Sequence, residues 1–444
     1  MKAESIKQKK ESSFKSIVRS LRHRNFRLFF GGQSISLIGT WMQRIALGWL
    51  VYRMSNSAFL LGLVGFAGQI PTFFFASFAG VLADRRSRHR ILILTQSLAM
   101  VQAFILSFLV FSHLIRIWHI IVLAVFLAIV NAFDMPTRQA FLVEMVEDKK
   151  DLGNAIALNS SMVNGARLLG PTAAGMLIAA FGEGTCFLIN AITYMAVIVS
   201  LLLMQIERKD GQPRQSKVWQ ELKDGFRYAA GFAPIRDILL IFALVNLVGM
   251  PYMVLMPVFA KDVLHGGPSA LGFLMGCSGL GALGGAVFLA SRKSVLGLEK
   301  MIPIAATIFG SALIVFSFSR LLFFSLGLMM LTGSGQMIMM ATSNTLLQTI
   351  VDDDKRGRIM SFYTMAFMGA TPVGSLIEGF LASKIGAPWT VFIGGLICIC
   401  GALIFIKRLS ILRELVRPIY VKMGIIPEIA MGIQSASELS IHRK

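Results

Sequence analysis

The chain has 444 residues, of which 55% are hydrophobic and only 15% charged, and its mean hydropathy is +0.70. These values are typical of an integral membrane protein and exclude an ordinary soluble domain. The formal net charge of +20 has to be interpreted on a membrane, where basic residues collect on one side. It does not indicate nucleic acid as a partner.

Twelve apolar segments follow one another along the chain. Each is long enough to cross a bilayer as a helix, because a hydrocarbon core of roughly 30 Å needs about 20 residues. The segments do not alternate between apolar and polar residues, which argues against a membrane barrel. The sequence therefore predicts an all-α membrane protein with spans at 28–50, 58–82, 91–112, 117–137, 155–180, 184–205, 237–259, 270–290, 302–319, 321–345, 359–382 and 388–406.

The spans fall into two sets of six, in halves at 28–206 and 237–406, and a polar linker at 207–236 separates them. Apolar residues at helical spacing in the linker predict a short amphipathic helix there. The loops at 146–155 and 351–360, which open the fifth and eleventh spans, resemble each other. Two pseudo-symmetric six-helix halves are a known transporter construction.

The distribution of basic residues predicts the topology. If the N-terminus is inside, 35 of the 43 Lys and Arg residues lie in the tails and in internal loops, and only five lie in external loops. This bias predicts a multi-pass protein of the bacterial cytoplasmic membrane with both basic tails, 1–27 and 407–444, in the cytoplasm. The first 25 residues lack the apolar stretch and cleavage site of a signal peptide.

Five charged residues in or directly beside predicted spans stand out, because an ionisable group in lipid costs about 2.5–3.5 kcal/mol and usually faces the bundle interior. Asp134 and Arg138 are four residues apart and can pair on one helix face, either as a structural ion pair or to couple protons to transport. Glu378 lies near the outer end of its span, where it either couples protons or reaches water. Arg44 either faces the interior or snorkels to the outer headgroups, and Arg167 either pairs structurally or contacts substrate.

Charged residues follow the second span in the sequence GVLADRRSRHR at 80–90. This stretch resembles the G-x-L-x-D-R-x-G-R-R signature of the major facilitator superfamily, with Ser87 where the pattern has glycine. A simple topological anchor is the alternative interpretation. The resemblance implies a motif that holds the inner gate closed in the outward-facing state, with Gly80, Asp84, Arg85 and Arg88 as its residues.

The fifth span contains the sequence NGARLLGP at 164–171, followed by Gly175. It is similar to the Gly-Pro motif in the fifth helix of the superfamily's exporters. That resemblance implies helix bending at Gly170, Pro171 and Gly175, because proline removes a helix hydrogen bond. Close helix packing at small residues explains the same pattern equally well.

Three further stretches, at 24–43, 133–142 and 186–194, resemble the enterobactin-exporter-like branch, whose members are called transmembrane secretion effectors. The likeness covers nearly the whole chain except the tails. In the superfamily the first, fourth, seventh and tenth helices line the central path, although polar residues there can also join helices. With one residue added from the fifth span, the implied substrate cavity contains Gln33, Arg44, Asn131, Arg167, Asn246 and Gln336.

These features predict a secondary active transporter that exports a small molecule, such as a siderophore, drug or metabolite, by alternating access and proton antiport. A monomer in the lipid bilayer is expected to suffice. A proton-coupled uptake symporter is the first alternative, and a non-transporting sensor or assembly subunit is the second. An enzyme is not expected, because the chain shows no nucleophile–base pattern, no metal-ligand spacing among its Cys and His residues and no nucleotide-binding loop. We therefore expect no cofactor and no metal.

Overall fold

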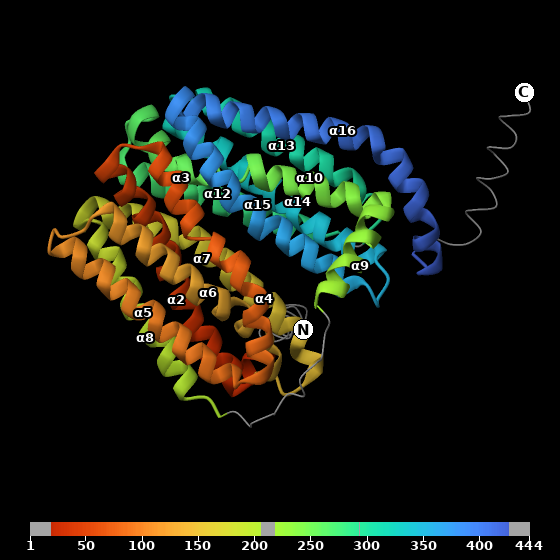
Figure 1. Cartoon of the computed structure of the whole chain (residues 1–444), viewed down its shortest axis with the longest axis horizontal. Helices are drawn as coiled ribbons and strands as arrows, with labels where there is room; N and C mark the ends of the chain where they lie inside the picture. Colours follow the sequence, from red (N-terminus) through yellow and green to blue (C-terminus); the bar gives the residue numbers. More distant parts are fainter. Residues whose placement is uncertain (1–18, 206–217, 293, 426–444) are drawn as a thin grey trace, which may run out of the picture.

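The computed structural model describes residues 19–205, 218–292 and 294–425, and it describes the backbone alone at 76–77, 80–81, 83–85 and 218–224. All regular secondary structure within this part of the chain is helical. Figure 1 shows the helices of the first and second parts of the chain in two adjacent groups.

The first group begins with a 3₁₀ turn at Arg19–Arg22, and a second such turn at Lys149–Asp151 precedes α7. Its helices are α2 (Arg24–Ser55), α3 (Ala58–Ala67), α4 (Ile70–Arg85), α5 (Arg88–Phe111), α6 (Ile117–Glu144), α7 (Leu152–Phe181) and α8 (Glu183–Leu202).

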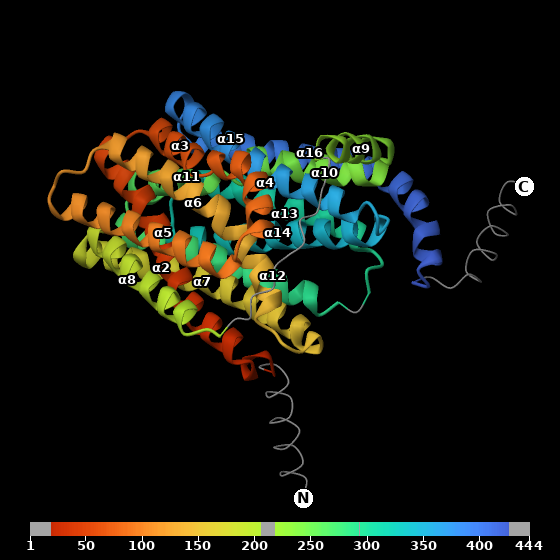
Figure 2. The same cartoon turned by 60° about the horizontal axis from the view of Figure 1, so that its bottom comes forward.

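The second group follows the linker and includes one π-helical turn, η3 (Phe259–Val263). Its helices are α9 (Val218–Gly231), α10 (Ala233–Val248), α11 (Tyr252–Val258), α12 (Gly267–Ala290), α13 (Leu298–Phe318), α14 (Leu322–Ile350), α15 (Arg356–Ile385) and α16 (Ala387–Lys422). The first of these, α9, lies where the amphipathic linker helix is predicted, and it packs beside α10 (Figure 2).

Two of the predicted spans are broken helices. The second consists of α3 and α4, which are separated at Gly68 and Gln69, and Pro71 follows in the first turn of α4. The seventh consists of α10, α11 and η3, with Gly249 and Pro251 at the break. Proline interrupts both because it has no N–H to donate. When each broken helix is counted as one crossing, the twelve-helix architecture is confirmed.

Ten of the twelve crossings are long and apolar enough to span a membrane, and α2 and α7 are the two that are not. These two have ample length, 32 and 30 residues, but they carry Arg44 and Arg167. They pack together closely, since a Cβ built on Gly170 would lie 2.9 Å from the Ile38 carbonyl oxygen and 2.5 Å from the Trp41 Cβ. The two crossings without a sufficiently apolar window therefore pack against each other.

The last helix continues past the predicted end of its span at residue 406. Beyond that point α16 buries Leu412, Val416 and Tyr420. It also places Arg413 Nε 3.0 Å from Glu299 Oε1 and Arg408 Nη1 3.4 Å from Asp237 Oδ2. Paired charges and a buried stripe keep this segment helical to Lys422, where a tail from residue 407 was expected, and Figure 2 shows it running beyond its neighbours.

The two groups approach each other most closely through glycines. A Cβ built on Gly62 of α3 would lie 2.8 Å from the Cα of Gly379 on α15, and one built on Gly175 of α7 would lie 2.8 Å from the Cα of Gly272 on α12. Such distances are shorter than real Cβ contacts, so only glycine fits. We call the bundle end that holds the α2–α3 turn the distal end, and the end that holds Arg19 and Lys422 the terminal end. Both glycine pairs lie toward the distal end.

Candidate functional site

A hydrogen bond joins the two halves near the middle of the bundle. Arg167 of α7 donates from Nη2 to Oε1 of Gln336 on α14, over 3.0 Å. The backbone around Arg167 packs against α12, where a Cβ on Gly279 would lie 2.8 Å from the Arg167 carbonyl oxygen. Beside it, the Tyr252 and Ser278 hydroxyls lie 3.0 Å apart. The structure thus brings together two of the predicted cavity residues from opposite halves.

Arg44 lies on the face of α2 that is turned toward the second half. Its guanidinium is 4.8 Å from the ring centroid of Trp41. One turn further along, a Cβ built on Gly48 would lie 3.6 Å from Pro257 of α11. Arg44 is close enough to Arg167 for their charges to interact. Arg44 thus shares a helix face with Gly48, which lies beside the second half, and its own side chain is exposed.

A small cavity in the second half contains two more of the predicted residues, Asn246 and Gln336. The Asn246 side chain donates 2.7 Å to the Phe242 carbonyl oxygen, one turn earlier in α10. Flexible methionines suit irregular apolar ligands. The remaining lining residues are apolar and come from α10, its C-terminal break, α14 and α15: Phe242, Val245, Met250, Met339, Met340 and Phe367.

The other two predicted cavity residues lie in the first half. Gln33 of α2 is buried and Asn131 of α6 is half-buried. A buried amide network that the sequence did not reveal lies nearby. Gln43 donates 2.9 Å to Gln102, and Asn190 donates 2.7 Å to Gln43. Asn190, a polar residue of a predicted span, thus joins α8 to α2 and does not line the cavity.

Asp134 is satisfied within the first half. Its carboxylate is buried and accepts hydrogen bonds from Thr95 Oγ1 at 3.0 Å and Gln96 Nε2 at 2.7 Å, both on α5. Arg138 Nε lies 3.5 Å from its other oxygen. The arrangement holds α5 against α6, and it also gives a carboxylate whose partners on two helices would have to part before it could meet water.

Glu378 of α15 has a different environment. Its side chain is only 5% exposed, so access to water is not what explains its position. It points at α16, where a Cβ on Gly394 would lie 3.7 Å from its Oε1. Its Oε2 has no hydrogen-bond partner among the described residues. An ionisable group buried in this way in a membrane segment is a candidate for function.

The structure describes only part of the gating motif that is formed by Gly80, Asp84, Arg85 and Arg88. The backbone of α4 ends at Arg85, and the side chains of Gly80, Asp84 and Arg85 lie outside the described residues. Arg88 donates 2.6 Å to Glu144 at the end of α6. In the Gly-Pro motif, α7 continues through Pro171, and Gly170 and Gly175 give close packing against α2 and α12.

Polar contacts close the distal end. Tyr52 of α2 donates to Asp262 of η3, and Lys261 donates 2.6 Å to Asn56 at the end of α2. Both bonds cross between the halves. Lys261 is one of the five basic residues expected in external loops, and nothing in its spacing relates it to a residue 205 positions earlier.

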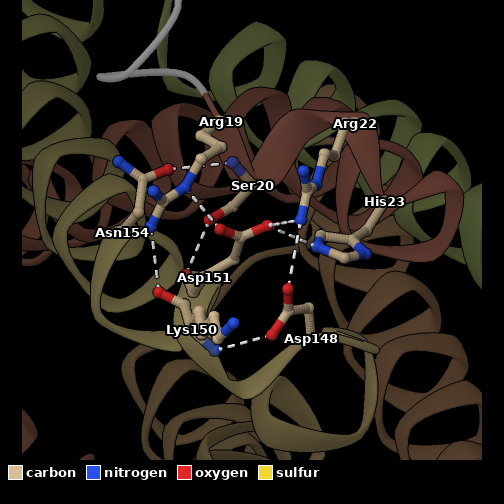
Figure 3. A network of polar contacts seen from close by, with 8 residues as sticks. All are labelled: Arg19, Ser20, Arg22, His23, Asp148, Lys150, Asp151 and Asn154. Atoms are coloured by element: carbon tan, nitrogen blue, oxygen red, sulfur yellow. Dashed lines mark hydrogen bonds and ion pairs between the residues drawn. The ribbon is translucent and has the colours of Figure 1, made fainter.

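Another network ties down the terminal end of the first half (Figure 3). Arg19, Arg22 and His23 converge on Asp151 of the turn before α7. Arg22 Nη2 is 2.7 Å and His23 Nε2 is 2.9 Å from Asp151 Oδ2. Burial acts to raise the pKa of Asp151, but the His23 hydrogen bond and the two arginine charges outweigh it and lower that pKa.

The second half has a similar polar contact at the corresponding position. Tyr228, on the helix that precedes α10, donates 3.3 Å to Asp352 in the loop before α15. Lys355 lies 4.4 Å from the Tyr228 ring centroid. Burial, followed by the Asp352 charge, raises the pKa of Tyr228. In each half, a segment before the first membrane crossing is held by the acidic loop that precedes the fifth crossing, α7 or α15.

This fold and its central polar cluster define a multi-pass membrane transporter. The model of the transmembrane secretion effector family matches residues 15–415, so the chain belongs to that family, within the major facilitator superfamily. Its members are transporters and not enzymes.

Three relatives in sequence are named as a transporter or as efflux proteins. The chain is 28% identical to the staphyloferrin A transporter of Staphylococcus aureus, over 85% of this chain and 94% of the relative. It is 22% identical to macrolide efflux protein A of Streptococcus pyogenes, over 86% and 96%. It is also 27% identical to the multidrug efflux pump Tap of Mycobacterium tuberculosis, over 84% and 90%.

Solved structures share the fold. A bacterial homologue of the human lysosomal transporter Spinster, inward-facing and unoccupied, matches with a TM-score of 0.66 at 13% identity over 90% of this chain and 98% of that one. A POT family transporter in complex with 5-aminolevulinic acid matches with a TM-score of 0.69 at 12% identity, over 88% and 96%. At this identity the likeness concerns the fold alone.

Proposed function

We propose that this protein exports a small organic molecule from the bacterial cytoplasm by alternating access, in exchange for protons. The observation that carries the proposal is the closed distal end, with cross-half bonds from Tyr52 and Asn56, above a polar centre at Arg167 and Gln336. A transporter closed at one end and polar at its centre is arranged to load substrate from the other end.

The terminal end is proposed to be cytoplasmic. The bias of 35 basic residues against five supports this orientation, and both tails then lie in the cytoplasm beside a cytoplasmic membrane. On this arrangement the end held closed by Tyr52 and Asn56 is the outer one. The motif of Gly80, Asp84, Arg85 and Arg88 is proposed to close the cytoplasmic side in the opposite state, while α7 bends at Gly170–Pro171 and slides at Gly175. A monomer contains all these parts.

Export is favoured over uptake by what the relatives are called, since two of the three are named efflux proteins. Proton coupling is proposed to use Glu378, which is buried with an unpartnered oxygen, and the Asp134–Arg138 pair, whose separation is 3.5 Å. The environment of each of these carboxyl groups, Glu378 and Asp134, changes if the helices around it move.

Everted membrane vesicles from cells that express the protein test the proposal. A panel of labelled anionic, neutral and cationic compounds is added with an acid interior. We expect at least one compound to accumulate, and a protonophore to abolish the accumulation. Accumulation that resists the protonophore would refute proton coupling. Accumulation in right-side-out vesicles, driven by external acid, would indicate an uptake symporter, and no movement of any compound would favour a sensor or assembly subunit.

A further inference from the structure

The central site contains two arginines that have no acidic partner among the described residues. Arg44 contacts the ring of Trp41 at 4.8 Å. Arg167 contacts the amide oxygen of Gln336 at 3.0 Å. A ring face and a neutral amide each attract a cation weakly compared with a carboxylate.

Several arginines elsewhere in the described part of the chain are paired with acids. Arg138 has Asp134 at 3.5 Å, and Arg53 has Glu183 at 2.6 Å. At the terminal end Arg413 has Glu299 at 3.0 Å. Among the described residues, acids therefore pair with these arginines and none pairs with the central two. Of the other two buried carboxyl groups, Asp151 is held by Arg19, Arg22 and His23 at the terminal end, and Glu378 points at Gly394 of α16.

The positive charges of the two guanidiniums lie close enough to reinforce each other. Arg44 and Arg167 interact through their charges, and their helices pack together at Gly170, one turn from each arginine. Like charges that are close together repel each other, and both arginines stay protonated because arginine does not lose its proton in proteins. The positive charge at the centre is therefore uncompensated until an anion arrives.

We propose that the substrate is an organic anion, with carboxylate or similar oxyanion groups that bind between Arg44 and Arg167. A guanidinium presents a planar pair of donors that matches a carboxylate. The amide of Asn246 and the apolar side chains around Gln336 line a cavity of about 10 Å³, which has to widen before it can take the uncharged part of such a molecule. This inference rests on the proposed transport function and specifies its substrate class.

An anion between the arginines also affects the link between the halves. Arg167 holds Gln336 of the second half by one neutral-acceptor bond. A carboxylate is the stronger acceptor, so it competes with Gln336 for Arg167. Substrate binding would then exchange the direct contact between α7 and α14 for a contact through the ligand.

Binding to the purified full-length protein in detergent tests the substrate class. The probes are three acids (citrate, salicylate and naphthalene-1-acetate) and their ethyl esters, at constant ionic strength, with thermal unfolding as the readout. We expect at least one acid to raise the Tm and its ester not to do so. Equal stabilisation by acids and esters, or by neither, would overturn the proposal.

Variants locate the effect. Arg44→Gln and Arg167→Gln are each expected to weaken binding of the active acid about tenfold or more, since a hydrogen bond to a charged group is lost. Arg44→Lys and Arg167→Lys should retain part of the affinity. The matched control is Arg320→Gln, because Arg320 is an exposed residue between α13 and α14. Affinity that is unchanged in the double Gln variant would overturn the assignment.

The transport panel separates this inference from the function beneath it. Proton-driven movement of neutral or cationic compounds, without movement of any acid, would support the proposed export and contradict the proposal that the substrate is an anion. If no compound moved, both would fall. Movement of an acid that Arg167→Gln abolishes and Arg320→Gln preserves would support both.

Discussion

Tyr52 of α2 donates its hydroxyl proton to Asp262 of η3, and this bond joins the two halves of the transporter at the distal end. The neighbouring residues reinforce it. The Nζ of Lys261 lies 5.4 Å from the Tyr52 ring centroid and donates to Asn56. Four side chains thus hold closed the end that must open when substrate leaves on that side.

Removal of the Tyr52 hydroxyl should favour opening of the distal end. Tyr52→Phe loses a hydrogen bond to a charged acceptor, worth about 1.5–3 kcal/mol, so the open population should rise about tenfold or more. Spin labels at the exposed positions Leu114 and Leu321, one in each half, would report a longer distance in the variant. Tyr228→Phe is the control, because Tyr228 bonds within the second half. Identical distance distributions for the natural protein, Tyr52→Phe and Tyr228→Phe would show that the Tyr52–Asp262 bond does not hold the distal end closed.

The glycine contacts between the halves lead to a second prediction. Gly175→Ala places a methyl group against Gly272 on α12, and overpacking of this kind costs typically 1–3 kcal/mol. We expect a lower Tm and slower transport. Gly165→Ala on the same helix meets nothing within 4 Å and should be neutral or slightly stabilising, because alanine is the better helix former. The prediction is wrong if the two variants unfold at the same temperature.

Much of the fold follows from hydropathy, which located every crossing, since backbone groups in lipid are satisfied only in helices. The breaks were harder to place. Pro71 and Pro251 lie within apolar runs, and proline in a membrane helix gives either a kink or a break. The extension of α16 was missed because the pairing of Arg413 with Glu299 joins residues far apart in sequence.

The candidate site could be predicted residue by residue but not as an arrangement. Arg167 and Gln336 were each identifiable as polar groups within spans. Their contact was not, because helical periodicity describes faces of one helix and says nothing about which faces meet. Glu378 was placed near water by its position in the chain, yet the packing of α16 at Gly394 buries it.

The Asp151 network predicts how stability depends on pH. The pKa of Asp151 is lowered in the folded protein, so its contribution to stability is present above the unfolded-state pKa of aspartate and is lost as the pH falls through the lower folded value. Asp151→Asn should therefore reduce the Tm at pH 7, and its difference from the natural protein should shrink in strong acid. Asp148→Asn is the control, since Asp148 is 43% exposed and lies 3.4 Å from Arg22. A deficit that stays constant down to the lowest pH would contradict this account.

Glu378 offers a test of proton coupling that does not require the natural substrate to be known in advance. Any compound that moves in the vesicle panel serves as the reporter. Glu378→Gln keeps the shape of the side chain but cannot exchange a proton, so accumulation driven by an acid interior should fall at least tenfold. Exchange of labelled for unlabelled compound needs no net proton movement, and it should persist.

The control for this variant is Glu414→Gln, because Glu414 is exposed on the extension of α16, and it should leave both activities intact. Loss of exchange together with accumulation in Glu378→Gln would mean that Glu378 serves the structure or binds substrate. Full accumulation would transfer the coupling role to Asp134, whose partners Thr95, Gln96 and Arg138 would then have to separate from it during each cycle.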